Sequence, residues 1–124
     1  MRLVYLALGA RLGKNTYSAG VIFDPRFVNI GANTLIGESA LLVPHVIDGA
    51  DVAHYRIVIG NNVIVGARSV VMAGARIGDA VVIAVNSVVT KGCCIPDGEV
   101  WGGTPARRIF KHFKYASPPE KYGN

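Results

Sequence analysis

The sequence has 124 residues, a formal net charge of +5 and an apolar fraction of 51%. A chain of this length is expected to form one core that buries roughly two thirds of the surface exposed when it is unfolded. The basic residues are scattered up to a late cluster of Arg107, Arg108, Lys111 and Lys114, and no aromatic residues alternate with basic ones along a face, so nucleic-acid binding is not expected. No stretch is long enough to span a membrane, so membrane insertion is not expected either.

The first ten residues are mostly apolar and could be taken for the start of a signal peptide. Their apolar run is short, and no polar mature start follows it, so we expect a buried first strand instead. The two cysteines, Cys93 and Cys94, are adjacent and poorly placed to form a disulfide. Both observations favour a cytoplasmic protein.

Apolar residues recur at every sixth position over the centre of the chain. The series runs through Ile59, Val65, Val71, Ile77, Ile83, Val89 and Ile95. The same frame passes earlier through Ile30, Ile36 and Leu42, and Leu12 lies eighteen residues before Ile30. Neither an amphipathic helix nor a half-buried strand has a period of six, so each unit is a short strand followed by a corner.

The positions between these apolar anchors support such a coil. Three residues after an anchor the chain often has glycine or asparagine, which accept a left-handed backbone at low cost, at Asn33, Asn62, Gly74, Asn86 and Gly92. Four residues after it stand small or β-branched residues, at Thr34, Ala40, Val63, Ser69, Ala75, Val81, Ser87 and Cys93. Three units close a triangular coil, and coils of eighteen residues stack at the strand spacing of about 4.8 Å.

The repeat is interrupted between about Asp48 and Arg56. The frame is compatible with an insertion of eleven residues after Ile47. It is equally compatible with a shorter insertion followed by a degraded unit that begins at Ala53. The choice decides from which face of the prism the nearby histidines point.

The units Ile59-Gly60-Asn61-Asn62-Val63-Ile64 and Val65-Gly66-Ala67-Arg68-Ser69-Val70 resemble those of the hexapeptide-repeat acyltransferases. The string Asn86-Ser87-Val88-Val89-Thr90-Lys91-Gly92 and the ending Trp101-Gly102-Gly103-Thr104-Pro105-Ala106-Arg107-Arg108-Ile109 are similar to those of the sugar and antibiotic O-acetyltransferase branch. The resemblance covers about residues 12 to 109.

The resemblance implies an all-β fold, a left-handed parallel β-helix over residues 1–109, followed by a tail or short helix over 110–124. It also implies a homotrimer that transfers an acetyl group from acetyl-coenzyme A to a hydroxyl of a sugar or small hydroxylated acceptor, with no metal. The general rule for crossovers favours the right hand, so the left hand comes from the resemblance alone. We expect Trp101 to cap the open end of the prism.

Acyl transfer needs a base that takes the proton of the acceptor, and histidine titrates near neutrality. The resemblance points to His45, which follows a repeat unit just before the interruption, with His54 as the alternative. His112 lies in the tail. We expect Asp48, Asp51 or Glu38 to orient the ring by accepting from its other nitrogen.

The resemblance also implies a binding site for the donor, coenzyme A, at residues that match the family's site individually. It comprises Gly66, Ala67, Ala84, Val85, Thr90, Lys91 and Arg107. Lys91 and Arg107 suit the phosphates of coenzyme A, and small residues at 66 and 84 would let its thin arm approach the backbone. The family often has glycine-alanine-glycine-serine where this chain has Ala84-Val85-Asn86-Ser87. The side chain of Val85 is larger than alanine and occupies space in the donor groove.

Other functions are compatible with the same fold. A zinc enzyme of the gamma-carbonic-anhydrase type would need His45, His54 and His112, whose spacing does not match that class. An ice-binding rod would need a ladder of threonines that the chain lacks. A degenerate or purely structural β-helix stays open, as does an amine acceptor in place of a hydroxyl.

Overall fold

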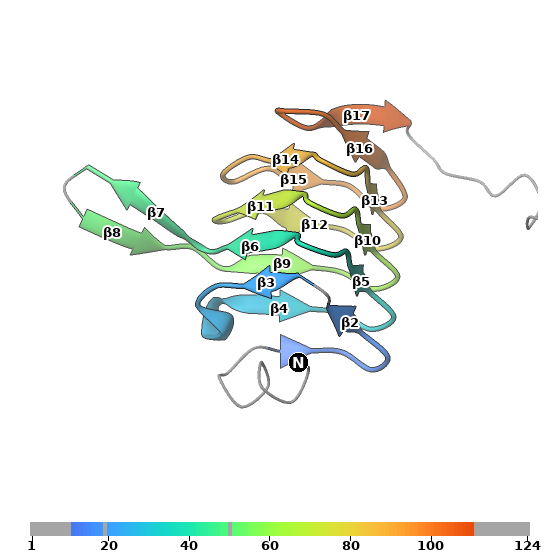
Figure 1. The fold of residues 1–124 in the computed structure, drawn as a ribbon, viewed down its shortest axis with the longest axis horizontal. Coiled ribbons are helices and arrows are strands. Elements are labelled where there is room, and N and C mark those ends of the chain that lie inside the picture. Colours follow the sequence, from blue (N-terminus) through green and yellow to red (C-terminus); the bar gives the residue numbers. More distant parts are fainter. Residues whose placement is uncertain (1–10, 19, 50, 111–124) are drawn as a thin grey trace, which may run out of the picture.

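The computed structural model describes residues 11–18, 20–49 and 51–110, and almost all of their ordered segments are short strands. The strands form a three-sided prism of stacked coils (Figure 1). As the chain climbs from its N-terminal end, the nearer strands run to the left and the more distant, fainter strands to the right (Figure 1). The coil is therefore a left-handed parallel β-helix, as the resemblance implied.

Each side of the prism is one sheet. The first face consists of β1 (Arg11–Leu12), β4 (Val28–Ile30), β9 (Ile57–Ile59), β12 (Arg76–Ile77) and β15 (Cys94–Ile95). The second consists of β2 (Tyr17–Ser18), β5 (Leu35–Ile36), β10 (Ile64–Val65), β13 (Val82–Ile83), β16 (Val100–Gly102) and β17 (Arg107–Phe110). The third consists of β3 (Val21–Ile22), β6 (Leu41–Val43), β11 (Val70–Met72) and β14 (Val88–Val89).

The predicted anchors form the core. All seven residues of the central series are at most 3% exposed, and they stack at a separation of eighteen residues, as Ile59 does on Ile77 and Ile77 on Ile95. Leu12 pairs with Ile30, which confirms that the frame extends to it. Trp101 is half-buried and packs against this core at the last coil, as expected of a cap.

Left-handed backbone marks the corners. The five predicted positions all have positive φ, and so do Ser39, Arg68 and Ala80, whose residue types do not favour a left-handed backbone. Because a side chain in this conformation costs of the order of 1 kcal/mol, the geometry of the coil overrides residue preference at these corners.

The interruption is a pure insertion of eleven residues, but it begins at His45, directly after Pro44, and not after Ile47 as predicted. Ile30 pairs with Ile59, 29 residues further on, whereas the other neighbouring strands of the first face are 18 residues apart, so eleven residues leave the prism and return in register. They form an antiparallel hairpin of β7 (His45–Asp48) and β8 (Asp51–His54), which projects from the prism (Figure 1). The neck is closed by a hydrogen bond of 2.8 Å from the Tyr55 amide to the Pro44 carbonyl.

Two corners of the prism carry the residues of interest. The hairpin corner, where the chain passes from the third face to the first, comprises residues 23–27, 44–56, 73–75 and 90–93. The groove corner, where it passes from the second face to the third, comprises residues 37–40, 66–69 and 84–87. β17 turns back antiparallel onto β16 above the last coil. The expected first strand within residues 1–10 and the tail beyond residue 110 lie outside the described part.

Candidate functional site

The two histidines of the hairpin lie opposite each other at its base. His45 opens β7, His54 closes β8, and the two are register partners in the hairpin. Because paired residues of an antiparallel ladder project from the same face, both rings point the same way, with centroids 6.3 Å apart. The sequence left the two as alternatives for one role, and the structure brings both to one place.

The carboxylate that contacts them is Asp24. Its Oδ2 lies 2.7 Å from His45 Nδ1 and 3.7 Å from His54 Nε2. A donating Nδ1–H on His45 fits the shorter contact and leaves Nε2 of that ring free to accept a proton. This assignment of the tautomer follows from the hydrogen bond. The expectation that Asp48, Asp51 or Glu38 orients His45 is therefore wrong, since Asp24 makes that contact.

Asp24 comes from the coil below. It has φ +45° and precedes the short 3₁₀ helix η1 (Pro25–Phe27) at the hairpin corner. Register places it under Pro44, beside the start of the hairpin, because Ile22 pairs with Leu42. Its left-handed backbone is one that it shares with several other non-glycine residues, among them Asn33 and Arg68, and it brings the carboxylate beside the two histidines.

Aromatic rings flank the pair. Phe27 stacks on His54 with centroids 4.8 Å apart, and Phe23 meets His45 edge-on at 6.1 Å. A pocket of about 470 Å³ opens here, lined by His54, Asp24 and the whole of η1. The site thus combines a histidine hydrogen-bonded to a carboxylate with a pocket that the same carboxylate and the second histidine line, and a histidine oriented in this way can act as a general base.

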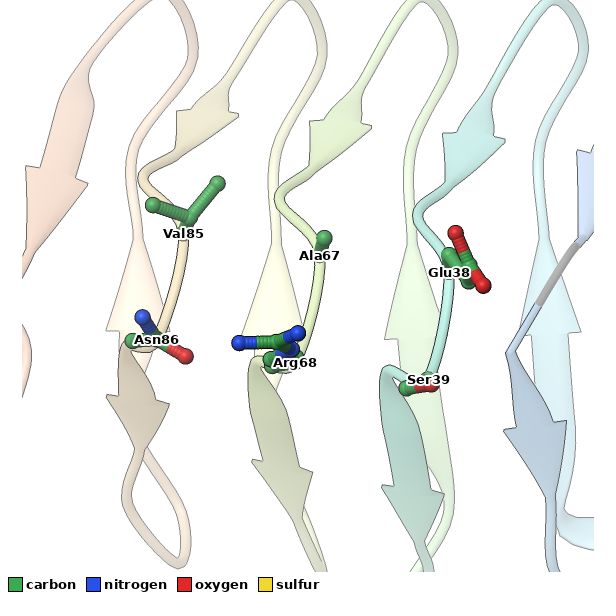
Figure 2. A pocket seen from close by; sticks show the side chains of 6 residues that line it. All are labelled: Glu38, Ser39, Ala67, Arg68, Val85 and Asn86. Carbon is green, nitrogen blue, oxygen red and sulfur yellow. The ribbon is translucent and has the colours of Figure 1, made fainter.

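A second pocket, of about 310 Å³, lies at the groove corner. Figure 2 shows its six side chains on three successive coils, with Glu38, Ala67 and Val85 in one row and Ser39, Arg68 and Asn86 in the next. Two predicted donor residues, Ala67 and Val85, therefore come together. Val85 is 62% exposed and projects into the groove.

Two other predicted donor residues have a structural explanation. A Cβ added to Gly66 would lie 2.6 Å from the Val85 amide nitrogen, and one added to Gly102 would lie 3.0 Å from Ala84 Cβ. Residues 66 and 84 therefore sit beneath the next coil. Their small size is required for coil stacking, whatever else they do.

The remaining donor candidates lie elsewhere in the chain. Thr90 and Lys91 belong to the hairpin corner, where Lys91 Nζ is 5.1 Å from the centre of the Tyr55 ring. Arg107 is exposed on β17. Within one chain, Lys91 is thus at the opposite edge of the third face from Ala67 and Val85.

The cysteines are free, Cys93 half-buried and Cys94 exposed. Burial raises the pKa of the Cys93 thiol, the adjacent Cys94 raises it further, and Arg107 opposes the shift. Within the described ranges, no group of three side chains could hold a metal ion, and no helix is long and apolar enough to cross a membrane. His112, the third histidine weighed for zinc, lies outside those ranges.

Comparison with known proteins relates this architecture to a family. Residues 56–91 match the model of the bacterial transferase hexapeptide, six repeats. A Bacillus subtilis protein, YvoF, whose name provisionally calls it an acetyltransferase, is 30% identical over 107 residues, which are 83% of this chain and 61% of that protein.

Solved structures agree with this match. A hexapeptide-repeat acetyltransferase of Vibrio cholerae, in complex with acetyl-coenzyme A, superposes with a TM-score of 0.76 at 30% identity, over 86% of this chain and 62% of that one. A galactoside acetyltransferase in complex with coenzyme A gives 0.68 at 29% identity, over 82% and 62%. The chain spans about three fifths of the length of these relatives.

Proposed function

Because this chain belongs to the hexapeptide-repeat acyltransferase family, we propose that it transfers an acetyl group from acetyl-coenzyme A to a hydroxyl of a sugar or small hydroxylated compound. The observation that carries the proposal is the hydrogen-bonded pair of His45 and Asp24 at the base of the hairpin, beside a pocket that Asp24 and His54 line. A groove at the same coil level, lined by Glu38 and Ala67, supplies a second binding region.

In the proposed reaction His45 is the general base. Its Nε2 takes the proton of the acceptor hydroxyl as the oxygen attacks the thioester carbonyl. The tetrahedral intermediate then expels the thiolate of coenzyme A, which takes up the proton from the imidazolium. Asp24 accepts from Nδ1–H throughout, so it fixes the ring and stabilises the imidazolium.

His54 remains the alternative base. It lies 1 Å further from Asp24 Oδ2, and its ring is stacked on Phe27. The longer distance is outside the range of a hydrogen bond, so His45 is the better oriented of the two.

We propose that the working unit is a homotrimer. The second face exposes an apolar ladder in which Leu35 and Ile64 are paired and are 42% and 41% exposed. Contact between copies would cover such a surface. If the groove corner of one copy lies against the hairpin corner of the next, Ala67 and Val85 of one chain meet Thr90 and Lys91 of its neighbour. In a three-fold trimer, the candidate donor-binding residues that lie apart within one chain would therefore come together between neighbouring chains.

A degenerate or structural β-helix is the competing function. The projecting Val85 favours it, because a branched side chain occupies space in the groove where the family often has alanine. An amine acceptor is the alternative within the transferase class. The free thiols of Cys93 and Cys94 support a cytoplasmic location.

Calorimetric titration with acetyl-coenzyme A and with free coenzyme A tests the proposal. We expect saturable micromolar binding at one site per chain, followed by turnover in an acceptor screen. Absence of binding by the assembled protein would favour the structural β-helix and remove the reason to regard His45 as a base.

A further inference from the structure

Glu38 is an exposed carboxylate at the foot of the groove corner. It lies between β5 and β6, on the coil from which the hairpin leaves. Figure 2 shows it at the end of the row that continues through Ala67 and Val85 on the two following coils. Within the described ranges it forms no ion pair, although Arg68 lines the same pocket. The groove therefore has an unpaired negative charge at this end.

The row has a direction that fits the donor. Lys91, one candidate for binding the donor phosphates, follows β14 on the same coil as Val85, and Arg107, the other, lies on β17 above the last coil. Both cations are therefore at the level of the Val85 end of the row or beyond it. Phosphates favour the positive end and are repelled by a carboxylate. The thioester of a donor held along the row is thus at the Glu38 end.

One face of the hairpin matches this row. His45 and His54 are register partners at its base, and Val52, two residues before His54, projects from the same face. The hairpin leaves the coil of Glu38 and slants toward the level of the later coils (Figure 1). From base to tip this face carries first the two histidines and then an apolar residue. In the same order the row of the groove is first acidic and then apolar.

Two exposed valines support a contact between these surfaces. Val52 on the hairpin is 63% exposed and Val85 in the groove 62%, more than any other large apolar side chain among the described residues. An isolated two-stranded hairpin is only marginally stable in water, so the projecting arm needs a surface on which to lie. Within one chain the groove corner is at the opposite edge of the third face. A three-fold ring of copies keeps each coil at its level and brings the groove of one copy to the hairpin of the next.

We infer that the acceptor site is shared between two copies: the hairpin of one copy lies on the groove corner of the next, and Glu38 of that next copy faces His45 and binds a second hydroxyl of the acceptor. The inference rests on the proposed acetyl transfer and homotrimer. A carboxylate is a strong acceptor of hydrogen bonds from hydroxyl groups, and a second contact fixes the reacting oxygen in front of the base. Glu38 therefore selects acceptors with at least two hydroxyl groups, as a sugar or another polyol has.

Cross-linking tests the placement without turnover. Cys93 and Cys94 are first replaced by serine, and a Glu38→Cys chain is co-expressed with a His54→Cys chain that carries a different tag. A short bis-maleimide should then link the two kinds of chain, and neither variant alone should be linked. Asn33→Cys is the matched control for Glu38→Cys, because Asn33 is exposed on the same coil but at the corner between the first and second faces. It should give no link.

Kinetics test the role of the carboxylate, with an acceptor found by the screen. Glu38→Gln keeps the shape of the side chain and removes its charge, so the KM for the acceptor should rise about tenfold, the effect of weakening one charged hydrogen bond, while the KM for acetyl-coenzyme A stays the same. Equal co-expression of His45→Ala and Glu38→Ala chains gives trimers in which about a quarter of the interfaces have both side chains intact. Below the KM for the acceptor, activity should therefore reach about a quarter of that of the unaltered protein. If both residues acted within one chain, and Glu38→Ala kept about a tenth of the activity, the mixture would stay at about one twentieth.

The outcomes separate the inference from the proposed function. A trimer that gives no link between residues 38 and 54, or mixed trimers that show no gain in activity, would overturn the inference and leave acetyl transfer standing. A monomeric protein would overturn it as well. If the unaltered protein turns over no acceptor, the proposed function fails, and the cross-link alone then decides whether Glu38 of one copy faces the histidines of the next.

Discussion

The contact between Asp24 and His45 gives the sharpest prediction. Asp24→Asn preserves the shape of the side chain but removes its charge. A hydrogen bond to a charged group contributes about 1.5 to 3 kcal/mol. The two side chains are 42% and 38% exposed, so solvent screening places the effect at the low end, and kcat should fall about tenfold. The KM for acetyl-coenzyme A and the thermal midpoint should not change, because neither the groove nor the core is touched.

A double-mutant cycle shows through which ring Asp24 acts. In a His45→Ala background, itself lowered by about two to four orders of magnitude, Asp24→Asn should add less than about twofold. In a His54→Ala background it should still cost about tenfold, since His54 Nε2 is 3.7 Å from the carboxylate.

The assay is release of the coenzyme A thiol with a thiol-reactive dye, using an acceptor found by the screen. The reverse pattern, with the effect of Asp24→Asn lost only in the His54→Ala background, would make His54 the base. Full additivity in both backgrounds would refute a positioning role for Asp24.

Three further outcomes are expected. Leu42→Ala, at a fully buried position, should lower the urea unfolding free energy by about 3 kcal/mol, whereas Leu35→Ala, 42% exposed, should cost less than about 1 kcal/mol. Iodoacetamide should modify Cys94 before Cys93 in mass spectra, and Cys93 should need a higher pH, because its raised pKa keeps it a thiol where an ordinary cysteine ionises; equal rates would contradict this. Ala67→Glu should weaken acetyl-coenzyme A binding more than about tenfold in calorimetry without lowering the melting temperature, since a carboxylate in the groove repels the phosphates.

The prism could be predicted because every unit of the repeat needs a buried apolar residue at the same position. Each anchor such as Val71 or Val89 meets the same requirement, an apolar residue inside a short strand, so the signal accumulates over many units. The corners were predictable only in part. Asn62 predicts a left-handed turn because asparagine accepts positive φ at low cost. Arg68 adopts the same conformation because the coils on either side impose it.

The site was less predictable because its residues lie in segments that do not follow the six-residue period. Counting back in sixes from Ile30 gives position 24 as an inward anchor, but Ile22 takes that role and pairs with Leu42. Asp24 is thereby released to the corner beneath the hairpin. An aspartate at a position that the six-residue frame would turn inward was the available signal, since a buried unpaired carboxylate is costly. The eleven-residue insertion could not be separated from its alternative, because residue counts alone do not reveal that His45 pairs with His54.

The hydrogen-bonded neck of the hairpin makes the register of the coils independent of the length of the hairpin. Because the Tyr55 amide bonds to the Pro44 carbonyl, the coil continues in register whatever length of chain lies between them. The middle of the hairpin, beyond the paired His45 and His54, can therefore be lengthened or shortened without disturbing the stacked coils on either side. The stacked coils and the hairpin can therefore vary separately in sequence.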